Sequence, residues 1–350
     1  MSTKIPRLNL LVSAAYMEER EMQAIRRIGK SAHWLIDSGA FTNHQAQLRG
    51  ERAPVPLSSF MHWCHELEPY VWEVIALDVV MDVEATRSNL EAMHQDGLTP
   101  MPVFVHGEEW ERLPGLVAAH PQGRLCVAGG VKTRKDYAHH RYQKAWRVSE
   151  GKAQIHALGF VRWPDIFQLP LFTVDSSSWM AGGRMGVCGH YTRTVGMRTV
   201  AWKDLGSKRG LSVRGHLSRC GISVDQMRDE SLTKGVGGFL ALSVINAYVE
   251  LHCHASMLRP AYFFVIPNVG WLLALVAVVV AKRGRGDGTF DYHQASSLLT
   301  AYRERMKGGE DKRDEALDHL RAVLDEHTAA TAEPYSQATR PLHPAKENAT

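Results

Sequence analysis

Seven short apolar runs, separated by segments long enough for helices, dominate the first 180 residues of this 350-residue chain. Apolar runs that alternate with helical segments are typical of a parallel β-sheet covered by helices on both faces. The runs span residues 8–16, 33–41, 72–80, 101–107, 125–131, 154–160 and 171–179. Seven such units favour a closed barrel over an open sheet. We therefore predict an α/β fold of the (β/α)8 TIM-barrel type, with an eighth strand at 197–202.

Helical spacing recurs between the runs and again toward the C-terminus. Apolar side chains three and four positions apart predict amphipathic helices. The predicted helices span residues 17–28, 57–67, 83–94, 108–119, 238–257, 290–306 and 311–327. In the last of them, Leu317, Leu320 and Leu324 share one face. The unit between residues 155 and 175 is too short for a full helical crossover, so its helix must be brief.

The amino-acid composition of the chain changes after the seventh run. Between residues 182 and 219, glycines are frequent, and the segment contains eight Lys and Arg residues but a single acid, Asp204. We interpret this segment as a basic insertion that is either a solvated loop or a phosphate-binding element. Residues 1–327 are predicted to form a single domain that ends in helices. The polar tail at 328–350 is predicted to be disordered.

Three of the apolar runs carry an aspartate toward their C-terminal end, namely Asp37, Asp78 and Asp175. A carboxylate next to a buried strand is costly unless a site uses it. Because working groups of such barrels lie at the C-terminal ends of the strands, we expect these acids to converge. Each also has a simpler interpretation, since Asp37 precedes a Ser–Gly turn and Asp78 and Asp175 are candidate helix N-caps.

Composition and charge agree with a protein of the cytoplasm. The net charge of +4 permits a nucleic-acid partner without requiring one. The five cysteines are odd in number and widely spread, which argues against a disulfide framework and fits a reducing compartment. The N-terminus lacks the basic and then apolar pattern of a secretion signal.

One apolar stretch, at residues 261–281, approaches the length of a membrane span. Pro267, Asn268 and Gly270 interrupt it and leave an uninterrupted run of 11 residues. Runs of this length are more typical of buried strands or core helices. We therefore predict a buried element here, and no membrane partner.

Two motifs resemble a known enzyme family. Residues 37–41, Asp-Ser-Gly-Ala-Phe, are similar to the Asp-Ser-Gly-Gly-Phe signature of the tRNA-guanine transglycosylases. The strand at 155–160, Ile-His-Ala-Leu-Gly-Phe, and the segment at 173–179, Thr-Val-Asp-Ser-Ser-Ser-Trp, resemble one branch of that family more closely. That branch comprises the phage and bacterial 7-deazaguanine DNA transglycosylases. The resemblance covers residues 8–180 in the same order along the chain.

The resemblance implies an exchange of guanine in DNA for a free 7-deazaguanine base, such as 7-cyano-7-deazaguanine, without a cofactor. It gives Asp175 the role of the nucleophile that attacks C1′ and Asp37 the role of its acid/base partner. The implied substrate-binding residues are Phe41, Asp78, His106, Gly129 and Gly130. Among them, Phe41 would stack on the purine and Asp78 would accept hydrogen bonds from the edge of the base. Outside this set, His156 either orients a substrate or packs in the core.

The sequence departs from the family at its metal site. The tRNA enzymes carry a compact Cys-x-Cys-x-x-Cys…His zinc motif, and this spacing is absent here. Scattered residues offer only a distant set of zinc ligands, namely Cys188, His190, Cys220, Cys253 and His254. We therefore predict no metal and prefer DNA to tRNA as the substrate.

Three alternatives to this function stay open at this point. The first is a tRNA-guanine transglycosylase, which keeps the chemistry and changes the polymer. The second is a hydrolase of small N-glycosides that uses Asp37 and Asp175 with water as the acceptor. The third is a nucleic-acid-binding or membrane-associated protein without catalytic activity, whose strand-end acids only cap turns and helices.

Overall fold

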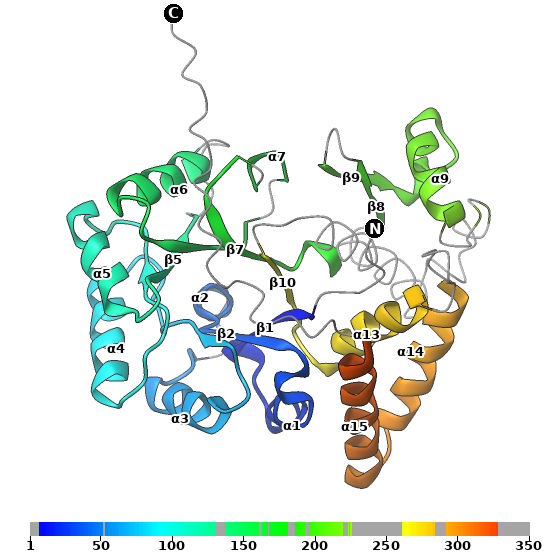
Figure 1. The fold of residues 1–350 in the computed structure, drawn as a ribbon, viewed down its shortest axis with the longest axis horizontal. Helices are drawn as coiled ribbons and strands as arrows, with labels where there is room; N and C mark the ends of the chain where they lie inside the picture. The colour runs from blue at the N-terminus through cyan, green and yellow to red at the C-terminus, as the bar shows by residue number, and fades with distance from the viewer. Residues whose placement is uncertain are drawn as a thin grey trace, which may run out of the picture.

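An eight-stranded, wholly parallel sheet forms the centre of the molecule in the computed structural model (Figure 1). The structure describes residues 7–51, 53–129, 137–160, 163–166, 168–180, 186–192, 196–219, 223, 225, 261–283 and 292–327. The strands of the sheet are β1 (Asn9–Ser13), β2 (His33–Asp37), β3 (Glu73–Val74), β4 (Val103–Phe104), β5 (Arg124–Ala128), β6 (Gln154–Leu158), β7 (Leu171–Ser176) and β10 (Ala261–Val265). The seven strands predicted in the first 180 residues are therefore confirmed.

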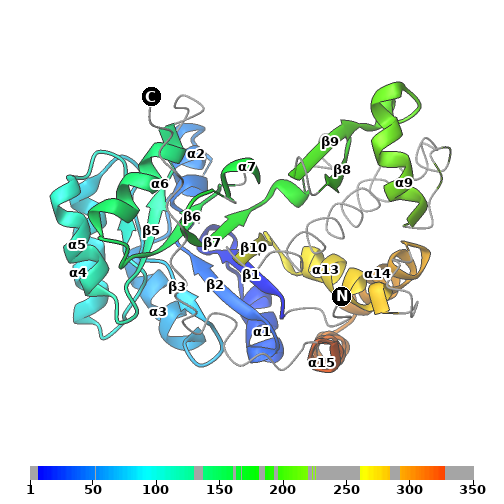
Figure 2. The same cartoon turned by 45° about the horizontal axis from the view of Figure 1, so that its top comes forward.

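The sheet curls so that its two end strands, β3 and β4, meet. An isolated parallel bridge joins Ile75 to Met101, directly beyond the end of β3 and before the start of β4. Two backbone bonds make this contact, since Met101 N–H donates to Val74 O at 2.7 Å and Ala76 N–H donates to Met101 O at 3.0 Å. Helices surround the strands (Figures 1 and 2). The fold is thus of the α/β, (β/α)8 TIM-barrel-like type, as predicted.

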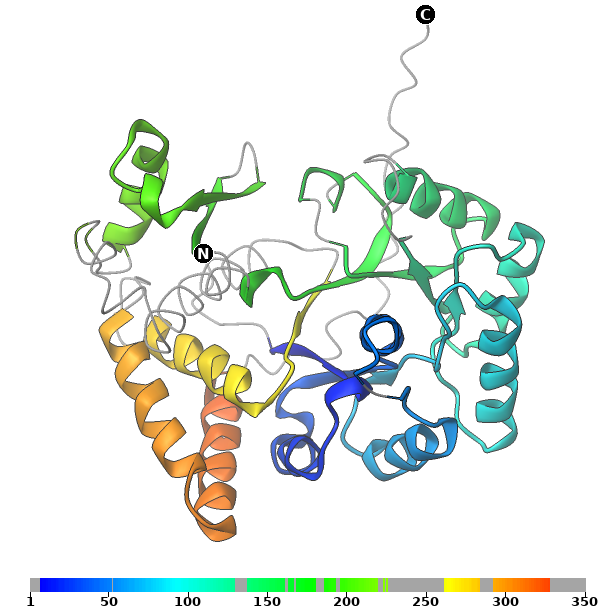
Figure 3. The same ribbon diagram turned by 180° about the vertical axis from the view of Figure 1, so that it is seen from behind.

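The eighth strand of the barrel is not the segment that the sequence suggested. Strand β10 lies between β7 and β1 and pairs in parallel with both (Figure 3). The predicted segment at 197–202 does contain a strand, β9 (Gly196–Ala201), but β9 pairs antiparallel with β8 (Val187–Thr192) in a separate hairpin. The prediction failed because the residues of β10 belong to the long apolar run, in which strand and helix cannot be told apart by periodicity.

That apolar run is a buried strand followed by a buried helix, as predicted. Pro267 and Asn268 separate β10 from helix α13 (Val269–Arg283), and Asn268 Oδ1 accepts a hydrogen bond from Gly270 N–H at 3.0 Å. Apart from its ends, α13 is almost entirely buried. Within the described parts of the chain, no helix combines the length and the apolar character needed to cross a bilayer.

Most of the predicted helices are present within one or two residues of their expected ends, although the helix predicted at 108–119 begins only at Leu113. They are α1 (Glu19–Ile28), α3 (Leu57–Leu67), α4 (Val83–Gln95), α5 (Leu113–Ala119), α14 (Tyr292–Met306) and α15 (Glu310–His327). The brief helix expected before β7 is α7 (Trp163–Ile166). Among the described residues, three helices were missed, namely α2 (Ala40–Leu48), α6 (Tyr137–Val148) and α9 (Leu211–Arg219). The buried face of α6 includes Arg141 and Tyr142, so it shows little apolar periodicity.

Helix α15 packs against α1 and the rest of the C-terminal part of the barrel. Its predicted stripe of Leu317, Leu320 and Leu324 is at most 2 % exposed. Asp314 of α15 pairs with Arg27 and accepts a hydrogen bond from Gln23 at 2.6 Å, both on α1. The C-terminal helices therefore belong to the wall of the barrel.

The described parts of the basic insertion, residues 186–192 and 196–219, are folded rather than a solvated loop. The hairpin β8–β9 leads into helix α9 (Leu211–Arg219), set to one side of the barrel (Figure 2). Cys188, Leu205, Val213 and Leu217 are fully buried and form part of its core. The helix predicted at 238–257 and the tail at 328–350 lie outside the described residues.

A polar cluster closes the N-terminal end of the barrel. Arg124 Nη1 donates to Glu73 Oε2 at 2.6 Å, and its guanidinium lies 4.5 Å from the centre of the Trp72 ring. The Nδ1 atom of His120 accepts two backbone N–H bonds, so its Nε2 carries the proton and donates to Glu73 Oε2 at 3.1 Å. Because these groups are nearly buried, the Glu73 carboxylate needs both Arg124 and His120 to compensate for its loss of contact with water.

We expect Glu73→Ala to destabilise the barrel by about 3 kcal/mol, because it leaves the buried Arg124 charge without its partner. Urea unfolding followed by tryptophan fluorescence measures this loss. Glu304→Ala, which removes an exposed partner of Lys307, is the matched control and should cost about 0.5 kcal/mol or less. Equal effects of the two substitutions would contradict the structural role of the cluster.

Candidate active site

Three carboxyl groups meet at the C-terminal end of the barrel. Asp37 is the last residue of β2, Asp175 is the penultimate residue of β7, and Asp78 follows β3. The negative charges of both Asp78 and Asp175 act on Asp37, so the three groups share one site. The structure therefore brings together the two acids, Asp37 and Asp175, on which the sequence-based hypothesis depends. Their catalytic roles stay predictions.

The environment of Asp37 perturbs its carboxyl group strongly. Burial, together with the nearby charges of Asp78 and Asp175, raises its pKa from 3.8 to about 7. Hydrogen bonds from Gly39 N–H and from the side chain of Ser13 act in the opposite direction. A carboxyl group with a pKa near neutrality can both donate and accept a proton, as acid/base catalysis requires.

Gly39 makes the turn after Asp37 possible. Its φ of +71° lies in the left-handed region, and a Cβ there would lie 2.6 Å from Ala15 N and 2.7 Å from Ser13 Oγ. Its N–H donates to Asp37 Oδ2 at 3.0 Å. The turn interpretation of Asp37 is thus correct for the backbone, and the same turn holds the carboxyl group at the mouth of the barrel.

Asp78 is held by the neighbouring strand end rather than by a helix. Ser38 Oγ donates to Asp78 Oδ1 at 2.6 Å, and burial raises the pKa of Asp78 while this bond lowers it. The N-cap of α4 is Asp82, whose side chain accepts from Ala85 N–H at 2.9 Å. The alternative interpretation of Asp78 as the N-cap is therefore wrong.

Asp175 is 6 % exposed and is fixed from the neighbouring strand β6. Gly159 N–H donates to Asp175 Oδ1 at 2.7 Å, and His156 Nε2 lies 3.3 Å from the same oxygen without hydrogen-bond geometry. The other ring nitrogen, His156 Nδ1, lies 2.7 Å from Thr173 Oγ1. His156 is thus a fully buried side chain that also touches the predicted nucleophile.

The residues after Asp175 anchor the end of β7. Ser178 N–H donates to Ser176 Oγ at 2.9 Å, so the short turn that follows uses this serine rather than Asp175. The indole N–H of Trp179 donates to Val265 O at 3.1 Å, at the end of β10. The Ser-Ser-Ser-Trp segment therefore joins the ends of two adjacent strands. The Asp175 carboxylate does not cap the turn that follows it.

Phe41, His106 and Gly129, the other predicted binding residues that the structure describes, lie at the same end of the barrel. Phe41 is 58 % exposed on α2, and His106 follows β4 with its ring 5.8 Å from that of Tyr137. Gly129 follows β5, and a Cβ at this position would lie 2.9 Å from Tyr142 Oη, so glycine permits the close packing of α6. Gly130 lies outside the described residues.

Sequence analysis missed Arg141, a buried cation at this end of the barrel. It is 5 % exposed and donates to the carbonyl oxygens of Ala128, Phe104 and Val105 at 2.9, 3.0 and 2.6 Å. It thus joins the ends of β4 and β5. Burial lowers the pKa of its guanidinium. In the sequence Arg141 is one of three basic residues in a polar segment, together with Lys144 and Arg147, and such residues are usually solvated.

Among the described residues, no group of three or more His, Cys, Asp or Glu side chains is arranged to hold a metal ion. Cys188 is buried in the core of the basic insertion. Cys220, Cys253 and His254, which completed the distant set of zinc ligands, lie outside the described residues.

Comparison of the chain with protein-family models and with curated protein sequences found no match. The features of this chain that bear on its function are therefore the sequence motifs and the geometry of the carboxyl cluster.

The raised pKa of Asp37 predicts how stability depends on pH. Between about pH 4 and pH 7 the folded protein keeps a proton on Asp37 that the unfolded chain releases, so this group lowers stability as the pH rises. Asp37→Asn keeps the acceptor for Gly39 N–H and removes the penalty. We expect this variant to match the wild type near pH 4 and to be more stable at pH 8.

Chemical unfolding of both proteins across this pH range measures the difference. One pKa unit corresponds to about 1.4 kcal/mol, so the gain at pH 8 is a few kcal/mol at most. Asp311→Asn, which changes an exposed carboxylate in the first turn of α15, should keep the pH dependence of the wild type. An Asp37→Asn variant with no gain at pH 8 would show that Asp37 is not perturbed.

Proposed function

We propose that this protein is a transglycosylase that exchanges guanine in DNA for a 7-deazaguanine base through a covalent intermediate on Asp175. The observation that carries the proposal is the cluster of three acids, in which the charge of Asp175 acts on Asp37 at the barrel mouth. The motifs that resemble the family place the same residues in complementary roles. When two carboxyl groups lie in different environments, one can act as the nucleophile and the other as the proton donor and acceptor.

The first step forms the covalent intermediate. A carboxylate oxygen of Asp175 attacks C1′ of the target deoxyguanosine, and the C1′–N9 bond breaks with its electrons going to guanine. The hydrogen bond from Gly159 N–H holds Oδ1, so Oδ2 is the oxygen that we assign to the attack. Protonated Asp37 gives its proton to the departing guanine, so that the base leaves neutral.

The second step repeats the substitution in reverse with another base. N9 of the incoming 7-deazaguanine attacks C1′ and passes its proton to Asp37, and the bond from C1′ to Asp175 breaks. Both acids return to their starting forms. Two inversions at C1′ preserve the configuration of the nucleoside, and one glycosidic bond replaces another without an external energy source.

Recognition of guanine is assigned to Asp78 and Phe41. The N1 and N2 donors of guanine suit a buried carboxylate, and Ser38 orients Asp78 through the bond to its Oδ1. An exposed aromatic ring suits stacking on a base that has left the duplex. We propose the cytoplasm, or the host cytoplasm for a phage-encoded enzyme, as the place of the reaction.

Asp175→Asn is expected to abolish guanine release from DNA, a loss of at least about 1,000-fold, because the amide is a poor nucleophile. Binding of DNA should change little, since Asn keeps the acceptor for Gly159 N–H. The assay incubates labelled-guanine DNA with a 7-deazaguanine base and analyses free bases and nucleosides by mass spectrometry.

Asp96→Asn, at the opposite end of the barrel, is the control and should retain full exchange. Full exchange by Asp175→Asn would exclude the proposed nucleophile. Exchange with tRNA but not with DNA would favour the tRNA enzyme, and release of free base from a nucleoside alone would favour the hydrolase.

The rate of guanine release should fall as the pH rises through about 7, because the first step needs the protonated form of Asp37. Single-turnover measurements with excess enzyme between pH 6 and pH 9 isolate this step. On the alkaline side we expect a tenfold fall for each pH unit. A rate that is constant up to pH 9 would exclude Asp37 as the acid.

A further inference from the structure

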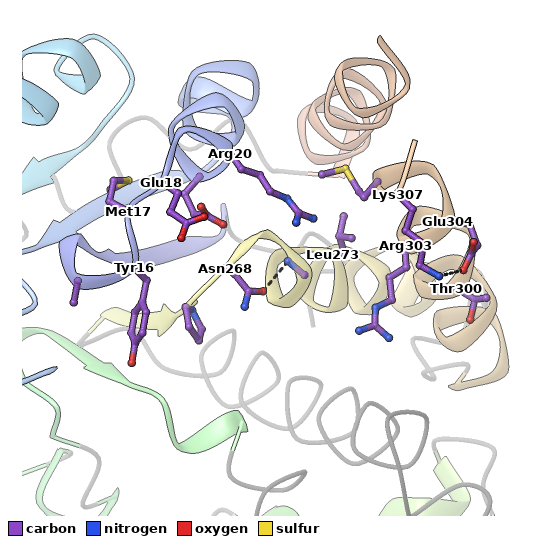
Figure 4. A pocket seen from close by; sticks show the side chains of 15 residues that line it. Tyr16, Met17, Glu18, Arg20, Asn268, Leu273, Thr300, Arg303, Glu304 and Lys307 are labelled. Carbon is purple, nitrogen blue, oxygen red and sulfur yellow. Dashed lines mark hydrogen bonds and ion pairs between the residues drawn. The ribbon is translucent and has the colours of Figure 1, made fainter. Parts of the chain in front are cut away.

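A cavity of about 940 Å³ opens beside the carboxyl cluster. Described residues of α1, α13 and α14 line it, together with the loops that leave β1 and β10 (Figure 4). These loops follow the C-terminal ends of their strands, so the cavity lies at the same end of the barrel as the three acids. The roles assigned to the barrel acids do not account for it.

A short chain of contacts links the cavity to Asp37. Ala15 lines the cavity, and its N–H donates to Ser13 Oγ at 3.3 Å. Ser13 in turn hydrogen-bonds to Asp37. The ring of Tyr16, next along the chain, is 44 % exposed and also lines the cavity. A chain molecule that places one unit at Asp37 can therefore reach the cavity with a neighbouring unit.

Two of the cationic side chains that line the cavity are arginines from different helices. Arg20 enters from α1 and Arg303 from α14, with Leu273 of α13 between them (Figure 4). Within the described residues, neither guanidinium makes an ion pair or a side-chain hydrogen bond. Planar guanidinium groups bind phosphate oxygens in pairs, and unpaired arginines beside a cavity are suited to that task.

The acids that line the cavity oppose these arginines only weakly. Glu304 is already paired with Lys307 at 2.6 Å (Figure 4). Glu21 is 7 % exposed, and burial raises its pKa although backbone hydrogen bonds, the first with Val269, lower it. Glu18 remains as an exposed acid near Arg20. The formal charges of the described lining residues balance, so the sites open to an anion are the two guanidinium groups that no acid engages.

We propose that this cavity binds the phosphodiester backbone of the DNA strand, next to the nucleotide whose base reacts at Asp37 and Asp175. This inference rests on the proposed function and adds the path of the strand across the barrel mouth. Arg20 and Arg303 each contact a backbone phosphate. Tyr16 offers a ring on which a neighbouring base stacks.

The test is a double variant, Arg20→Gln/Arg303→Gln, compared with Lys30→Gln/Lys152→Gln. The control removes the same charge, but its residues precede β2 and β6, at the opposite end of the barrel. Binding of a short single-stranded DNA is measured by fluorescence anisotropy over a range of NaCl concentrations. Guanine release is measured in single turnovers, with the enzyme in saturating excess over the DNA.

We expect the arginine variant to bind DNA roughly tenfold more weakly, with a salt slope smaller by about 1.4, because each lost phosphate contact removes about 0.7 from the slope for single strands. Guanine release at saturating enzyme, where all the DNA is bound, should equal that of the wild type. Affinity and slope equal to those of the lysine control would overturn the proposed strand path.

The two proposals fail in different ways. A wild type that binds DNA through the arginines but releases no guanine would overturn the exchange reaction alone. A wild type that releases guanine, with an arginine variant that binds DNA normally, would overturn the strand path alone. A loss of affinity confined to an RNA of the same sequence would overturn the choice of DNA.

Discussion

The burial of Asp37 beside two other carboxyl groups is the constraint around which this barrel is organised. Removal from bulk water, together with the charges of Asp78 and Asp175, raises the pKa of Asp37 to about 7. Such an arrangement costs stability. The closure of the sheet at Ile75 and Met101 and the ion-pair cluster around Glu73 at the opposite end supply the rigid frame that maintains it.

Each acid is held by a different neighbour, so the three groups are not equivalent. Gly39 N–H and Ser13 hold Asp37, Ser38 holds Asp78, and Gly159 N–H with the adjacent His156 holds Asp175. These contacts come from the ends of neighbouring strands, which is why a parallel barrel can position them. A difference in environment is also what the proposed division between nucleophile and proton donor requires.

Much of the barrel was predictable, because buried parallel strands are nearly continuous apolar runs. The convergence of Asp37 and Asp175 also followed, since the C-terminal ends of parallel strands share one edge. Strand β10 was not predictable as the eighth strand, because its residues merge with the apolar helix α13 across a break of only a few residues. The contacts of Arg141 were not predictable either, since they depend on carbonyl oxygens of two strands far away along the chain.

The most direct test is a titration of the Asp37 carboxyl carbon by NMR in the wild type and in Asp78→Asn and Asp175→Asn. The electrostatic coupling described here predicts a pKa near 7 in the wild type and a lower value in each variant, because each substitution removes one neighbouring charge. A wild-type pKa near 4 that neither substitution changes would contradict it.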